Sequence, residues 1–315
     1  MSVDGCTLQV VPDPFPPSGL LPDYQARRNL LMTEERAFDI CEMGLAPLLA
    51  ARSRGADLVA IPVFHYRRFR HSAIVCRTAA GIRKPEDLIG RRVGVRRLSL
   101  SAGIWARGLL QHEYGIPLNR IEWVVQVPTP LRPEIGDRLN VKLVPADEPL
   151  EGLLERGDLD ATIEAFAIGP MRESSKSVHP LFEDPIAAEI DYYRRTGIFP
   201  TMHTIVMYRH LAEQYPDLPM NVYGAFATAK MDAAGKSTGA PRYVLANEEQ
   251  HWVQELTPDQ RKTFLGEDAR GDPWKYSLQR DSNALETFLD YAFEQGISHR
   301  RFAVEELFAP STLHL

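Results

Sequence analysis

The chain has 315 residues, of which 44% are hydrophobic and 25% are charged, and its formal net charge is −6. This composition is typical of a globular protein with one large domain or two ordinary ones, and the acidic balance argues against a general nucleic-acid binder. No apolar run approaches the roughly 18 residues that a membrane span needs. Sparse cysteines without zinc spacing and the lack of a signal-peptide pattern favour a cytoplasmic protein.

Short apolar runs and longer periodic segments alternate along the first two thirds of the chain. The runs predict buried strands at residues 38–41, 58–64, 72–76, 121–127, 141–144, 160–163 and 204–208, together with a short strand at 7–11 and one that follows Gly90 and ends at Val95. Helices are expected at residues 27–35, 44–53, 99–114, 149–156, 187–195, 209–215, 218–231, 242–255, 257–265, 283–295 and 304–307. Strands that alternate with helices early, followed by helices gathered late, predict an α/β protein with parallel-rich sheets.

A basic loop joins the two strands predicted at 58–64 and 72–76. It contains two histidines and three arginines, His65, Arg67, Arg68, Arg70 and His71. In an open α/β sheet, ligands bind beyond the carboxyl ends of the strands. A loop of imidazoles and guanidiniums in that place suits an anionic ligand and proton transfer, although a solvated basic loop is an equally good interpretation.

Two further residues are expected to face the same crevice. Glu42 directly follows the strand predicted at 38–41, and His203 directly precedes the strand predicted at 204–208. Either Ser99 or Ser101 can cap the helix that follows the strand near residue 95, and a helix N-terminus after a strand favours anions. The sequence thus predicts a ligand cleft that several distant segments share.

Several segments, taken together, resemble 4,5-dihydroxyphthalate decarboxylases. They are Phe-Arg-His-Ser at 69–72, Trp-Ala-Arg-Gly at 105–108, Tyr-Tyr-Arg-Arg-Thr-Gly-Ile-Phe-Pro at 192–200, Met-His at 202–203 and Glu-Glu-Leu-Phe-Ala-Pro at 305–310. Weaker pieces at 87–95 and 157–163 resemble the second lobe of the type II periplasmic-binding-protein fold. The resemblance spans about residues 38–310 and implies two lobes with a ligand cleft between them. We expect lobe one at residues 1–93 and 204–315, and lobe two at residues 94–203.

The chain also departs from the pattern of that family. The family opens with a further strand and an Asp-Arg-Thr turn that reaches the cleft, and this chain is expected to begin after them. The segments 97–100 and 164–169 differ as well, and both are expected to line the cleft. A related aromatic acid is therefore an open alternative for the substrate.

The resemblance implies a cofactor-independent decarboxylase of a hydroxylated aromatic acid such as 4,5-dihydroxyphthalate. Such a reaction needs a base, an acid and a cation for the retained carboxylate. The residues expected to transfer protons are His65, His71, His203 and Glu42. The residues expected to contact the substrate are Arg67, Arg70, Ser99, Ser101, Trp105, Arg107, Glu164, Arg195 and Thr196. No metal and no other cofactor is expected.

Other interpretations stay open at this point. His65, His71, His203 and Glu42 are residue types that also ligate divalent metals, although no local spacing demands a metal site. Arg107 is more readily explained as a structural ion pair, and His71 as a residue that caps a strand. The functional alternatives are a non-catalytic solute-binding protein for aromatic carboxylates and a lyase or dehydratase of another cyclic acid. The expected partner is a small aromatic carboxylate, without nucleic acid or membrane, and assembly into a homo-oligomer is left open.

Overall fold

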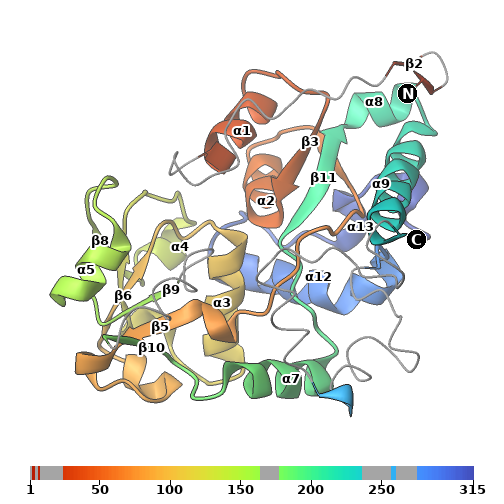
Figure 1. Ribbon diagram of the computed structural model, residues 1–315. Coiled ribbons are helices and arrows are strands. Elements are labelled where there is room, and N and C mark those ends of the chain that lie inside the picture. The colour runs from red at the N-terminus through yellow and green to blue at the C-terminus, as the bar shows by residue number, and fades with distance from the viewer. Residues whose placement is uncertain (1, 4–5, 8–23, 164–176, 236–256, 260–274) are drawn as a thin grey trace.

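The structure is a computed structural model that describes residues 2–3, 6–7, 24–163, 177–235, 257–259 and 275–315. The helix expected at 242–255 and most of that expected at 257–265 lie outside these described residues. Apart from a short hairpin of β1 (Ser2–Val3) and β2 (Cys6–Thr7), the described strands form one three-stranded and one six-stranded sheet. Figure 1 shows the two sheets in separate halves of the molecule.

The smaller sheet has the order β3-β11-β4, with β11 antiparallel to both neighbours. Its strands are β3 (Ile40–Gly44), β4 (Leu58–Ile61) and β11 (His203–Tyr208). Every residue of β4 is buried, which explains its continuous apolar sequence. The helices of this half are α1 (Tyr24–Thr33), α2 (Leu45–Ser53), α8 (Arg209–Gln214), α9 (Leu218–Gly235) and α13 (Val304–Leu307).

The larger sheet has the order β10-β5-β9-β6-β7-β8. Its strands are β5 (Ile74–Arg77), β6 (Arg92–Val95), β7 (Glu122–Val125), β8 (Asn140–Leu143), β9 (Ala161–Ile163) and β10 (Val178–Pro180). The four strands β9, β6, β7 and β8 run parallel, β5 is antiparallel to β9, and the edge strand β10 is antiparallel to β5. The expected α/β class is confirmed. The expectation of parallel-rich sheets holds for the larger sheet, in which three of the five pairings are parallel, but not for the smaller sheet, whose two pairings are both antiparallel.

Helices surround this larger sheet and fill the space between the two halves (Figure 1). They are α3 (Ser101–His112), α4 (Pro133–Gly136), α5 (Leu150–Arg156), α7 (Pro185–Thr196) and α12 (Leu278–Glu294). Short 3-10 turns are η1 (His71–Ala73), η2 (Thr78–Ala80), η3 (Pro85–Leu88), η4 (Leu118–Arg120) and η5 (Pro310–Thr312). None of the described helices combines the length and the apolar character that crossing a membrane requires.

The chain passes from the smaller to the larger sheet between β4 and β5, through the basic loop. The expected boundary near residue 93 placed β5 in the first lobe, whereas β5 pairs with β9 in the six-stranded sheet, with Ile74 opposite Ile163. The chain therefore enters the larger sheet before residue 74. The local sequence does not reveal this, because β9, the strand that pairs with β5, lies far away along the chain.

Side chains hold the basic loop and the segment that leads back to β11 against α12 and α3. Arg67 and Asp281 form a buried ion pair, with Arg67 Nη1 2.7 Å from Asp281 Oδ1. Trp105 Nε1 donates to the carbonyl oxygen of Thr201 at 2.8 Å, and Arg67 forms an isolated β-bridge with Thr201. The bridge between Arg67 and Thr201 lies two residues from His65 and two residues from His203, so it holds the segments that carry the two histidines side by side.

Candidate active site

Glu42 and His203 meet because of the register of β3 and β11. His203 lies opposite Gly44 and Ile205 lies opposite Glu42. Residues two apart on a strand share a face, so Glu42 and His203 are diagonal neighbours on the same face of the sheet. The distance from His203 Nδ1 to Glu42 Oε1 is 2.5 Å.

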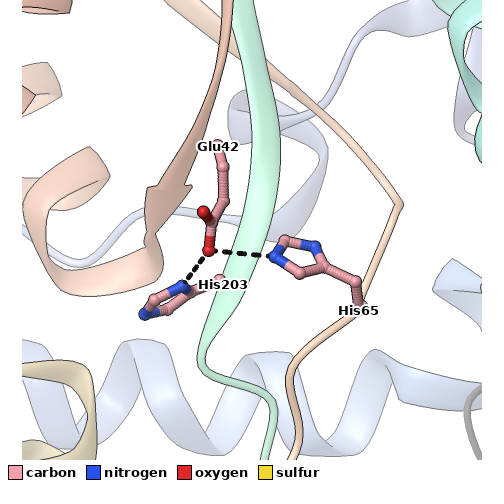
Figure 2. Close-up of side chains that lie close together, drawn as sticks. All are labelled: Glu42, His65 and His203. Atoms are coloured by element: carbon pink, nitrogen blue, oxygen red, sulfur yellow. Dashed lines mark hydrogen bonds and ion pairs between the residues drawn. The ribbon is translucent and has the colours of Figure 1, made fainter. Parts of the chain in front are cut away.

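His65 reaches the same carboxylate oxygen from the basic loop, four residues after β4. Its Nε2 lies 3.0 Å from Glu42 Oε1, and its Nδ1 lies 3.4 Å from the carbonyl oxygen of Val63. Figure 2 shows the carboxylate of Glu42 lying between the two imidazoles. One oxygen thus receives hydrogen bonds from two histidines that come from different segments.

Arg28, on α1, contacts the other oxygen of the same carboxylate. Its Nη2 lies 2.8 Å from Glu42 Oε2, and its side chain is 13% exposed. Sequence reasoning missed this residue. A short helix was expected at 27–35, but nothing in its sequence indicates which arginine faces β3.

The charges of this cluster follow from burial and hydrogen bonding. Burial alone would raise the pKa of Glu42, but hydrogen bonds from His203 and His65 outweigh it and hold that pKa well below its usual range. Burial lowers the pKa of His203, against the opposing effect of its hydrogen bond to Glu42. An ionised carboxylate can only accept, so Nδ1 of neutral His203 carries the proton and Nε2 keeps its lone pair.

Ser101 adjoins the cluster at the first residue of α3. Its Oγ accepts a hydrogen bond from the backbone N–H of Ala46 at 3.1 Å and so caps α2. A Cβ on Gly44 would lie 3.2 Å from Ser101 Oγ and 3.5 Å from His203 Cδ2. Because Gly44 has no side chain, the first residue of α3 can approach His203 closely. Ser99 is half-buried in the loop that precedes α3.

Three of the arginines expected to contact the substrate hold other parts of the fold. Arg67 is paired with Asp281. Arg107 is buried, donates from Nε to Gln295 at 2.9 Å and from Nη2 to the carbonyl oxygen of Leu98 at 2.6 Å, and burial lowers its pKa to about 9. Arg195 is half exposed and pairs with Asp191 at 2.8 Å and Glu113 at 2.7 Å. None of these contacts belongs to the cluster at Glu42.

The remaining expected residues also lie elsewhere. His71 is 1% exposed against the rings of Tyr114, Phe182 and Tyr192, and burial lowers its pKa to about 3. These aromatic neighbours are far from His71 along the chain, so the sequence around it does not show that the structure buries this expected acid or base in a neutral form. Arg70 is buried just before η1.

Trp105 packs on Phe288 and Tyr291 in the core, and Thr196 Oγ1 donates to the carbonyl oxygen of Tyr192 at 2.7 Å at the end of α7. Both residues were expected to contact the substrate. In the structure the ring of Trp105 packs against α12, and the hydroxyl of Thr196 closes the end of α7. Glu164 lies outside the described residues.

Comparison with known proteins identifies the family. The chain is 31% identical over 285 residues to the 4,5-dihydroxyphthalate decarboxylase of Comamonas testosteroni, and the match covers 88% of this chain and 83% of that protein. The chain belongs to the 4,5-dihydroxyphthalate decarboxylase family. A second member, from Pseudomonas putida, is 33% identical over 164 residues, which cover 50% of this chain and 64% of that protein. No protein-family model matches the chain.

Solved structures identify the fold of this decarboxylase-family protein. The periplasmic aliphatic sulphonate binding protein SsuA from Escherichia coli superimposes with a TM-score of 0.53, covering 93% of this chain and 86% of that chain at 15% identity. The expected type II periplasmic-binding-protein-like fold is confirmed. At this identity the likeness extends to the fold alone.

Proposed function

We propose that this protein is a carboxy-lyase that removes carbon dioxide from a hydroxylated aromatic acid such as 4,5-dihydroxyphthalate. The observation that carries the proposal is the convergence of His65 and His203 on one carboxylate oxygen of Glu42. Membership of the decarboxylase family supports the reaction, and the cluster supplies the groups that proton transfer requires.

Direct loss of carbon dioxide from an aryl carboxylate would leave a carbanion in the plane of the ring, which the π-system does not stabilise. A hydroxyl group para to the carboxylate opens another route. In our mechanism Nε2 of His203 takes the hydroxyl proton, and His65 delivers a proton to the ring carbon that bears the carboxylate. The bond to the carboxylate carbon then breaks, its electron pair returns to the ring, carbon dioxide leaves, and His203 gives its proton back to the ring oxygen. Each turnover consumes one proton from solvent.

The geometry supports different roles for the two histidines. His203 has one ring nitrogen on Glu42, and its other ring nitrogen has no hydrogen-bond partner among the described residues, so it can take the substrate proton as a base does. Both ring nitrogens of His65 face acceptors, Glu42 Oε1 and the carbonyl oxygen of Val63, an arrangement that suits a proton on each nitrogen and therefore an acid. Arg28 holds Glu42 from the opposite side and keeps the shared oxygen between the imidazoles.

We further propose that the two sheets are the cores of two lobes and that the substrate lies between them. Ser101 supports this placement because its hydroxyl meets α2 of the other half next to Gly44 and His203. The first turn of α3, Ser101 to Gly103, offers backbone N–H groups of the kind that bind carboxylates. We assign the retained carboxylate of the substrate to this turn.

The proposal is tested by supplying 4,5-dihydroxyphthalate to the purified protein and measuring release of carbon dioxide and the mass of the product. The variant His203→Gln should lower kcat by about 10²–10⁴, the usual contribution of a general acid or base. His112→Gln is the matched control, because His112 also pairs with a carboxylate, at 2.6 Å from Glu294, but on the surface. A His203→Gln enzyme with wild-type turnover would exclude our assignment of the base.

The same assay decides between the decarboxylase and its alternatives. A solute-binding protein would bind the aromatic acid and return it unchanged, which is a real alternative because proteins of this fold include a sulphonate-binding protein. A lyase or dehydratase of another cyclic acid would release a product of a different mass. Carbon dioxide release in stoichiometric amount with the decarboxylated ring excludes both.

A further inference from the structure

We propose that Glu42, His65 and His203 also bind one divalent transition-metal ion such as Zn²⁺, and that the bound ion stops turnover. The binding half of this proposal stands on the geometry of the three side chains alone. The inhibition half rests on the proposed function. A metal site was left open among the interpretations of the sequence, and the structure brings together three of the four residues named there.

The donor atoms have the chemistry and spacing of a metal site. One oxygen of Glu42 and one nitrogen from each histidine lie within 4.8 Å of one another. Two imidazole nitrogens and one carboxylate oxygen are ligands that Zn²⁺ and neighbouring divalent ions accept. Two atoms bound to one ion at about 2.1 Å and near-tetrahedral angles lie about 3.4 Å apart. The contacts of His203 and His65 to the Glu42 oxygen, 2.5 and 3.0 Å, differ from that spacing by less than 1 Å, and the two histidine nitrogens lie no more than 4.8 Å apart. Side-chain adjustment therefore suffices to bring the three donors around one ion.

The surroundings of two donors match the outer partners of metal ligands. A metal-bound histidine usually donates its other N–H to a carbonyl or carboxylate oxygen, and a metal-bound carboxylate is itself hydrogen-bonded. His65 has the carbonyl oxygen of Val63 at 3.4 Å from Nδ1. Glu42 has Arg28 Nη2 at 2.8 Å from its second oxygen. These outer contacts fix the orientation of the His65 ring and of the Glu42 carboxylate, which lowers the entropy lost when the two side chains bind an ion.

An ion held by these three residues would leave at least one coordination position open, because structural and catalytic zinc both take four or more ligands. The consequence for turnover follows from the electron pairs used. Coordination through Nδ1 of His203 takes the lone pair on that nitrogen and leaves the proton on Nε2, so the base is lost. Coordination through Nε2 of His65 removes the proton that our mechanism delivers to the ring.

Binding is tested on the full chain after treatment with a chelator and dialysis. Calorimetric titration with Zn²⁺ should give one ion per chain, and Co²⁺ should give the visible absorption of a site with nitrogen and oxygen ligands. His65→Gln and His203→Gln should each weaken Zn²⁺ binding at least tenfold, since losing even an outer partner of a ligand costs about 10–100-fold. Circular dichroism checks that each variant is folded, and the two independent variants keep the test decisive if one is not.

The control is His112→Gln, which removes an exposed histidine–glutamate pair and should leave the affinity unchanged. Binding that the two cluster variants do not weaken, or that His112→Gln abolishes, overturns the proposal.

Inhibition is tested by adding Zn²⁺ to the chelator-treated enzyme during carbon dioxide release. The concentration that halves the rate should equal the calorimetric Kd, and the chelator should restore the rate. A rate that rises with Zn²⁺ would overturn the inhibitory half and make the ion a cofactor. A protein that binds Zn²⁺ at the cluster but never releases carbon dioxide would refute the proposed function, while the calorimetry would still establish the site.

Discussion

The two ends of the basic loop have opposite environments, although the sequence makes them look alike. At its start, His65 is 28% exposed and contacts an ionised glutamate. At its end, His71 is 1% exposed, and its neighbours are aromatic rings. His203, from a segment far along the chain, shares the Glu42 carboxylate with His65, although His71 is nearer to it in sequence. Neighbouring charges and burial, rather than proximity in sequence, therefore decide which histidine is suited to proton transfer.

The largest expected effect on turnover comes from removing the negative charge of Glu42, which lies beside His65 and not beside His71. Glu42→Gln should lower kcat by about 10²–10⁴, because an amide no longer fixes the tautomer of His203 or stabilises a protonated His65. Turnover is measured beside a denaturant titration to show that the variant is folded. Wild-type kcat in a folded variant would remove Glu42 from the site.

Stability is expected to change most at the arginine between the two ends of the loop. Asp281→Asn leaves Arg67 buried without its carboxylate and should lower the free energy of unfolding by about 3–5 kcal/mol. Glu306→Gln is the matched control, since its pair with Arg300 is exposed and should contribute less than about 1 kcal/mol. Denaturant midpoints of the two variants measure the difference, and equal losses would contradict a structural role for Arg67.

The burial of His71 should make the stability of the protein depend on pH. The folded protein holds the pKa of His71 at about 3, below the value of about 6.5 for an exposed histidine. The unfolded chain therefore takes up a proton below about pH 6.5 that the folded protein does not bind. Stability then falls as the pH is lowered, by up to about 1.4 kcal/mol per pH unit for this one group.

Denaturant titrations between pH 6.5 and 5 test this expectation with His71→Phe, which keeps the ring contacts and cannot titrate. The variant should lose the part of the pH dependence of stability that His71 causes. The part that His203 causes has the same sign and should remain. Identical slopes for wild type and variant would show that His71 binds a proton in the folded protein.

The smallest effect is expected at Arg195, which the sequence placed with the substrate. Its pairs with Asp191 and Glu113 are on the surface, with the arginine side chain 51% exposed. Arg195→Ala should therefore change stability by less than about 1 kcal/mol and leave KM unchanged. A tenfold rise in KM would return Arg195 to the substrate cleft.

The fold class and the family could be predicted from the sequence, because apolar runs and local motifs report on local structure. Glu42 and His203 could be expected near each other because each was predicted beside the end of a recognisable strand, although Glu42 lies in the middle of β3 and His203 is the first residue of β11. The strand β10 was missed, since its three residues include a proline and it lies at the edge of the sheet. Helix α12 begins at Leu278, five residues before the expected start, after the capping residue Ser277.

The roles of single arginines could not be predicted in the same way. Arg28, Arg67 and Arg107 look equivalent in the sequence, yet their partners are Glu42, Asp281 and Gln295. Asp281 follows Arg67 by 214 positions and Gln295 follows Arg107 by 188 positions. A guanidinium takes its role from the acceptor that tertiary structure brings to it, and no local pattern contains that information.

The wide spacing of the cluster along the chain has a consequence for the order of folding. Glu42 contacts His65 across 23 positions and His203 across 161 positions. Closing such long loops costs entropy before the contacts that repay it can form, so contacts between distant positions form slowly. Helices and the strands of each sheet can appear while the three side chains are still apart. In a refolding experiment, helical signal should therefore recover before carbon dioxide release, and enzymatic activity becomes a measure of the last contacts that the chain makes.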